Sequence, residues 1–133
     1  MTEADLNIFL TGVGLLNEQA CFSKLTGGFH NAVWLVEIGD QQLVAKCFSE
    51  TMTGTLFPNL PIDEAEVLRR LDGLDVAPRL VGFWSEVSLL VYDYVEGSMW
   101  NGDMVGVAEL LLRKESADPT GFRTVPLTSE DIL

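Results

Sequence analysis

Three features in the first half of the chain could together hold a bound phosphate: a glycine pair, a lysine and a glutamate. Gly27 and Gly28 lie between two β-branched and aromatic stretches, where a turn can bring its backbone N–H groups close to phosphate oxygens. Lys46 lies in the apolar stretch 43–48, and a lysine among apolar side chains needs an anionic partner. Glu64 follows within a helical pattern and can supply that carboxylate. The order predicts an anion site in which Glu64 orients a buried Lys46 ammonium.

The stretch 43–48 has the pattern of a central strand. Alternation places Val44, Lys46 and Phe48 on one face, and Leu43, Ala45 and Cys47 on the other. Because both faces are apolar, we expect both to be covered. The alternative is a lysine whose chain passes Phe48 and carries the ammonium to solvent.

The helix expected from Pro61 to about residue 71 distinguishes its two central glutamates. At about 100° per residue its apolar side chains form one stripe, made of Ala65, Val67, Leu68 and Leu71. Glu64 points along that stripe toward the sheet, where a carboxylate is costly unless it is paired. Glu66 points nearly the opposite way and can pair with Arg70 one turn on. The alternative for Glu64 is a place at the edge of the stripe, near the first turn of the helix.

The remaining patterns predict an α+β domain with a five-stranded antiparallel sheet. We expect helices at 2–10 (with Thr2 as cap), 61–71 and 105–114, and strands at 20–25, 32–38, 43–48, 79–85 and 88–94. Residues 49–60 form a loop, and Asn31 braces the glycine turn rather than touching a ligand. Residues 1–97 are predicted to form the lobe, and 98–133 a linker helix and tail.

Composition limits the classes of function. The chain has 133 residues and a formal charge of −12, so it repels nucleic-acid backbones, and no apolar run reaches the roughly 18 residues of a membrane span. Cys21 and Cys47 match no metal spacing and are expected to be reduced thiols. The N-terminus is acidic where a secretory signal would be basic. We expect a cytoplasmic protein that binds neither nucleic acid nor membrane.

Together these segments resemble the N-terminal lobe of the aminoglycoside phosphotransferase and choline kinase superfamily, which has a protein-kinase-like fold. The residues that carry the resemblance are Leu25–Asn31 (a Gly-Gly-x-x-Asn loop), Leu43–Lys46 (the third strand), Asp63–Leu71 (helix C), Val76–Val81 and Leu90–Gly97 (the fifth strand and hinge). Each motif is loose, but five in the correct order are fairly specific.

The resemblance implies a site for ATP. Gly27, Gly28 and Phe29 would cover the β- and γ-phosphates with their N–H groups. Lys46 would contact the α- and β-phosphates, held by Glu64.

The same resemblance implies how the base is bound. The Asp93 carbonyl and the Val95 N–H would meet the adenine edge, with Tyr92 at the gatekeeper position. The acceptor pocket of this family belongs to the C-terminal lobe, so the phosphate acceptor stays open.

The catalytic part of the family pattern is absent from the sequence given. A catalytic His-x-Asp, an Asn five residues later and a metal-binding Asp are expected, whereas the only histidine, His30, lies in the glycine turn. We therefore expect the transferase activity, and the Mg²⁺ it uses, to require a missing C-lobe, and this chain alone to be inactive. The alternatives are a non-catalytic regulatory module that associates with a partner chain, or an unrelated α+β protein. If the chain is a kinase N-lobe, the apolar surface that would contact the C-lobe, around Tyr94, Met99 and Trp100, is exposed. Such exposure favours self-association or a partner chain.

Overall fold

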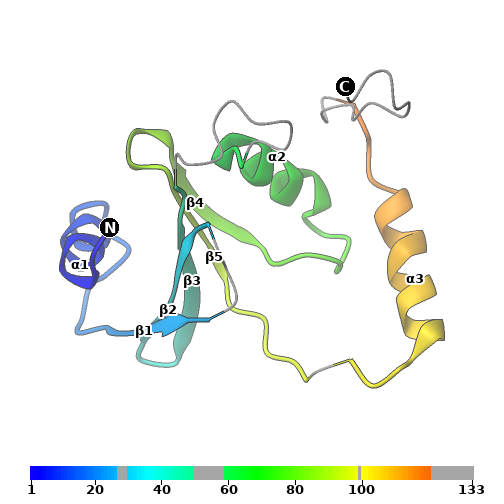
Figure 1. Cartoon of the computed structure of the whole chain (residues 1–133), viewed down its shortest axis with the longest axis horizontal. Coiled ribbons are helices and arrows are strands. Elements are labelled where there is room, and N and C mark those ends of the chain that lie inside the picture. The colour runs from blue at the N-terminus through cyan, green and yellow to red at the C-terminus, as the bar shows by residue number, and fades with distance from the viewer. Residues whose placement is uncertain (27–29, 50–58, 99, 121–133) are drawn as a thin grey trace.

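The computed structural model describes residues 1–26, 30–49, 59–98 and 100–120, which form one five-stranded antiparallel sheet with helices on its two faces (Figure 1). The strands are β1 (Cys21–Leu25), β2 (Ala32–Ile38), β3 (Gln41–Cys47), β4 (Leu80–Trp84) and β5 (Leu89–Asp93). They lie in the order β1-β2-β3-β5-β4, so β3 is the central strand. The predicted α+β class and antiparallel sheet are confirmed.

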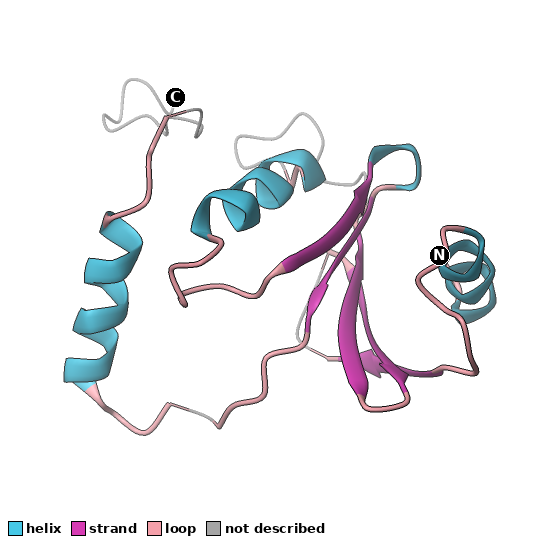
Figure 2. Cartoon of the chain, turned by 180° about the vertical axis from the view of Figure 1, so that it is seen from behind, coloured by secondary structure: helices cyan, strands magenta, loops and turns pink. Residues whose placement is uncertain are grey.

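Both faces of β3 are covered, as its two apolar faces predict. Leu43, Ala45 and Cys47 pack in a core with Leu6 and Leu10 of helix α1 (Glu3–Gly12). On the other face, Ala65 and Leu68 of helix α2 (Pro61–Leu71) pack on Leu90 of β5. The sheet therefore lies between α1 and α2, as Figure 2 shows from behind.

Helix α1 begins with the expected threonine cap. The Thr2 hydroxyl accepts from the Asp5 N–H at 3.2 Å, and the Asp5 carboxylate accepts from the Thr2 N–H at 3.0 Å. Phe9 meets the ring of Trp84 edge-on, with ring centroids 5.6 Å apart. That indole lies over Gly82, where any side chain would overlap the ring. The glycine thus lets β4 hold Trp84 against α1.

Helix α3 (Met104–Glu115) lies apart from the sheet, beyond α2 (Figure 1). Its start is capped by Asp103, whose carboxylate accepts from the N–H groups of Val105 and Gly106. Near its end, Arg113 pairs with Asp75 at 3.2 Å. None of its residues is buried, so ion pairs at the surface contribute to its placement.

The second hairpin differs in detail from the prediction. Both strands are shorter than expected, and a 3-10 turn at Ser85–Val87 joins them in place of a tight turn. Ser88 has a left-handed backbone with φ of 49°. The register also shifts between Leu80 and Gly82. Such a bulge carries no periodic signal, since it adds one residue without changing the apolar content.

Candidate functional site

The centre of the site is an ion pair between the central strand and helix α2. The Lys46 ammonium lies 2.6 Å from the Glu64 carboxylate, across 18 residues of sequence. The same ammonium lies 4.8 Å from the centre of the Phe48 ring. The acid that the stripe of α2 predicted is therefore the partner of Lys46. The passage of the lysine chain along Phe48, offered as the alternative, occurs together with the pairing.

The Lys46–Glu64 pair is half-open, meaning that both side chains are partly exposed to solvent. The prediction of a buried Lys46 ammonium is therefore wrong. The side chains of Lys46 and Glu64 are 20% and 31% exposed. Val33, directly opposite Lys46 on β2, is also only partly buried. The Lys46 side chain and its partner thus both keep contact with solvent.

Two other side chains of α2, Glu66 and Val67, point in different directions from Glu64. Glu66 points away from the sheet and pairs with Arg70 at 2.8 Å, as predicted. This hydrogen bond lowers the pKa of the Glu66 carboxyl. Val67 is wrongly assigned to the buried stripe, since it is 36% exposed and faces toward α3. The predicted apolar stripe of α2 covers two faces of the helix. One face packs on the sheet, and the neighbouring face, which carries Val67, lines a separate pocket.

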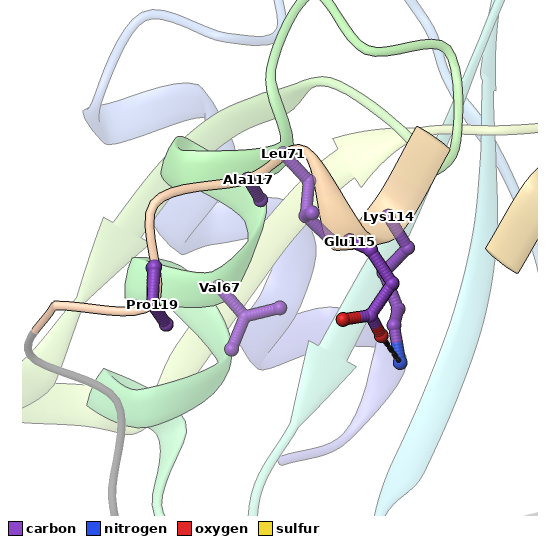
Figure 3. A pocket seen from close by; sticks show the side chains of 6 residues that line it. All are labelled: Val67, Leu71, Lys114, Glu115, Ala117 and Pro119. Carbon is purple, nitrogen blue, oxygen red and sulfur yellow. Dashed lines mark ion pairs between the residues drawn. The ribbon is translucent and has the colours of Figure 1, made fainter. Parts of the chain in front are cut away.

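That pocket lies between α2 and the end of α3 (Figure 3). Its volume is about 330 Å³, and its lining residues are Val67, Leu71, Lys114, Glu115, Ala117 and Pro119. The two charged side chains pair with each other at 3.6 Å. It does not include Lys46 or Glu64, and the sequence patterns did not indicate it.

An apolar wall adjoins the lysine. Val44 faces the same side of β3 as Lys46 and lies opposite Tyr92 of β5. Val33 completes this wall through its pairing with Lys46. Burial raises the pKa of the Tyr92 phenol, and the negative charge of Glu64 raises it further. The alternation of β3 indicated Val44, but neither valine was assigned to a site.

The segment after β5 starts in a fixed position. The Asp93 N–H donates to the Arg79 carbonyl at 3.0 Å. The Arg79 guanidinium donates back to both carboxylate oxygens of Asp93, at 2.9 and 3.1 Å. Val95, two residues on, is 65% exposed. The end of β5 is therefore clamped to the residue before β4.

Gly27, Gly28 and Phe29 lie outside the described residues, as does Met99. Their flanks are described: β1 ends at Leu25, which pairs with Val33.

Neither a cluster of metal ligands nor a membrane-spanning helix is found in the part of the chain that the structure describes. No three His, Cys, Asp or Glu side chains gather there as the ligands of a metal would. No helix there is long and apolar enough to cross a membrane.

The comparisons with known proteins concern the fold. No family model and no curated sequence matches the chain. Among solved structures, it is similar to an ethanolamine kinase of Plasmodium vivax, with a TM-score of 0.54 and 17% sequence identity. The match covers 72% of this chain but only 27% of the kinase chain. The chain therefore has the fold of a kinase N-lobe, and it spans about a quarter of the kinase that it matches.

Proposed function

We propose that this chain is the ATP-binding N-lobe of a small-molecule kinase that transfers the γ-phosphate to a hydroxyl acceptor. The observation that carries the proposal is the half-open pair of Lys46 and Glu64 at 2.6 Å. A lysine that is held by a carboxylate and open on one side suits a polyphosphate, because a charge-assisted contact is strong where water is partly excluded.

In the proposed complex the triphosphate lies against one end of the sheet. Lys46 contacts the α- and β-phosphates, and Glu64 keeps its ammonium directed. Gly27, Gly28 and Phe29 donate backbone N–H groups to the β- and γ-phosphates.

The adenine ring is proposed to lie on the apolar wall formed by Val33, Val44 and Tyr92. The Asp93 carbonyl and the Val95 N–H would then pair with the edge of the base. The Arg79–Asp93 clamp supports this assignment, since it fixes the strand end that offers these groups.

Phosphoryl transfer also needs a base and metal ligands. The described residues do not form a Mg²⁺ site, and we assign both roles to a second lobe. The name of the structural neighbour makes an amino-alcohol acceptor a candidate for the whole enzyme.

ATP titration of the chain by calorimetry, extended to millimolar nucleotide, tests the proposal. Weak binding is expected, and Lys46→Met should lower the affinity about tenfold or more by removing a charged contact. Lys24→Met is the matched control, because Lys24 is an exposed lysine of β1 that pairs with Trp34 on the other face. If the unaltered chain does not bind ATP, or if Lys46→Met binds it equally well, the proposal is wrong.

A second candidate, a non-catalytic module that binds a partner chain, is favoured by apolar exposure. Val105 and Leu112 of α3 are 70% and 73% exposed, and Trp100 before it is 66% exposed. Such side chains mark contact surfaces when they adjoin. ATP binding that depends on Lys46 favours the kinase, whereas assembly without nucleotide binding favours the module.

A further inference from the structure

One side-chain oxygen joins three segments that are distant in sequence. The Asn31 Oδ1 atom accepts a hydrogen bond from the Ser49 N–H at 3.2 Å. It accepts a second from the Asn59 side-chain amide at 2.6 Å. Both bonds are partly buried, and they span 18 and 28 residues. An amide oxygen has two acceptor positions, and these two donors use both.

Each segment leads directly to a part of the site. Asn31 immediately precedes β2, which carries Val33 opposite Lys46. Ser49 follows the strand of Lys46. Asn59 precedes helix α2, which carries Glu64 in its first turn. The contact therefore joins the start of β2 to the end of β3 and the start of α2.

The start of α2 has no side-chain cap of its own. Its N-cap residue is Leu60, which makes no capping hydrogen bond. A helix usually fixes its first turn with a Ser, Thr, Asp or Asn at this position. Here the asparagine stands one residue earlier and binds Asn31 instead. The Asn59–Asn31 contact therefore ties the residue before the N-cap of α2, whose first turn carries Glu64, to the start of β2.

We propose that Asn31 is a positioning residue of the phosphate site: it holds the start of α2 against the end of β3 so that Glu64 reaches Lys46. Asn31 acts through that pair and does not touch the nucleotide. The consequence for ATP affinity rests on the proposed function, whereas the coupling of the three segments does not.

The first test measures amide hydrogen exchange by NMR in the 133-residue chain. In Asn31→Ala the N–H groups of Ser49 and of Glu64 should exchange about two- to tenfold faster, because the substitution removes both the bond from Ser49 and the bond from Asn59. Asn31→Asp keeps an acceptor oxygen in the same place and should restore the slow exchange. Asn7→Ala, at an exposed asparagine of α1, should change neither. If exchange at both amides is unchanged in Asn31→Ala, the proposal is overturned.

The second test measures ATP and adenosine affinity. Asn31→Ala and Asn59→Ala should each weaken ATP about two- to tenfold and leave adenosine unchanged, because only the phosphates reach Lys46. In a Lys46→Met background Asn31→Ala should have no further effect, as expected of groups that act in series. Equal losses in both backgrounds would overturn the positioning role. If the unaltered chain does not bind ATP, the proposed function fails, and hydrogen exchange alone decides the coupling.

Asn59→Ala serves if Asn31→Ala does not fold. It removes the shorter of the two bonds and leaves the Asn31 Oδ1 atom bonded to the Ser49 N–H. It should speed exchange at Glu64 more than at Ser49, and the reverse order would contradict the proposal.

Discussion

The charge of Lys46 is neutralised by a neighbouring carboxylate, although its side chain is still partly exposed to solvent. Its ammonium is neutralised by Glu64 at 2.6 Å and lies 4.8 Å from the centre of the Phe48 ring, yet the side chain stays 20% exposed. Full burial would favour stability only if every donor found a partner. A pair that is only partly buried keeps some contact with solvent, which suits an anion that binds and leaves.

The two neighbouring glutamates of α2 give a matched pair for testing this residue. Glu64→Gln should lower ATP affinity about three- to tenfold, because the ammonium loses the charge that directs it. Glu66→Gln should leave the affinity unchanged, since Glu66 pairs with Arg70 on the other side of the helix. Calorimetric titration of both variants checks the prediction. Equal losses would show that the net charge of α2, rather than the pair, is what matters.

Two ionisable side chains, the buried Cys47 and the partly buried Tyr92, should make the chain less stable in alkali. Burial raises the pKa of the Cys47 thiol above 9.0, and burial with the charge of Glu64 raises the pKa of Tyr92 above 10.0. Each folded-state pKa is raised, so this stability is complete below the ordinary value and is lost as pH rises through the folded one. The free energy of unfolding in urea should therefore fall above pH 9.0, and again above pH 10.0.

Tyr92→Phe separates the two contributions. It removes the phenolic hydroxyl, so the free energy of unfolding should fall less steeply above pH 10.0. The fall due to Cys47, which begins above pH 9.0, should remain. Urea unfolding across the same pH series measures both slopes. An unchanged slope above pH 10.0 in Tyr92→Phe would contradict the assignment.

At the scale of elements, the sequence predicted each α-helix and strand of the described residues, because period and end signals are local. Thr2 at the start of α1 and Pro61 at the start of α2 are such signals. The two apolar faces of β3 likewise indicated two covering layers. The 3-10 turn and the register shift of β4 were not predictable, since they arise where Trp84 packs on α1.

Helix α1 provides a direct test of the second layer. Leu10 is fully buried against the sheet, whereas Ile8 on the same helix is 74% exposed. Leu10→Ala should lower the free energy of unfolding by about 3 kcal/mol, from lost burial and a residual cavity. Ile8→Ala should change it by less than about 0.5 kcal/mol. Urea unfolding measures both, and a similar small loss would show that α1 is not part of the core.

At the scale of the molecule, the segment that follows β5 carries exposed apolar side chains. Tyr94 and Trp100 are 37% and 66% exposed, as the sequence suggested, and Val95 between them is 65% exposed. Exposed apolar side chains favour association, because water is released when they are covered. The expected result is self-association or a partner chain.

Sedimentation equilibrium tests this expectation. The average mass should rise with concentration, and Val95→Ser with Trp100→Ser should reduce the rise. Ile8→Ser is the matched control, because Ile8 is an exposed apolar residue, 74% accessible, on α1. A constant monomer mass at all concentrations would contradict the prediction.

The sequence by itself determined the elements, the two-sided cover of β3 and the choice of Glu64 over Glu66 as the partner of Lys46. These follow from periodicity, which fixes the direction of each side chain within its own element. The tertiary structure decided what periodicity does not encode: the strand order, the partial exposure of the ion pair, the pocket behind Val67 and the meeting of Asn31 with Asn59. Contacts between polar side chains far apart in sequence depend on how elements are placed against one another, and that placement is set by the packing of the whole core.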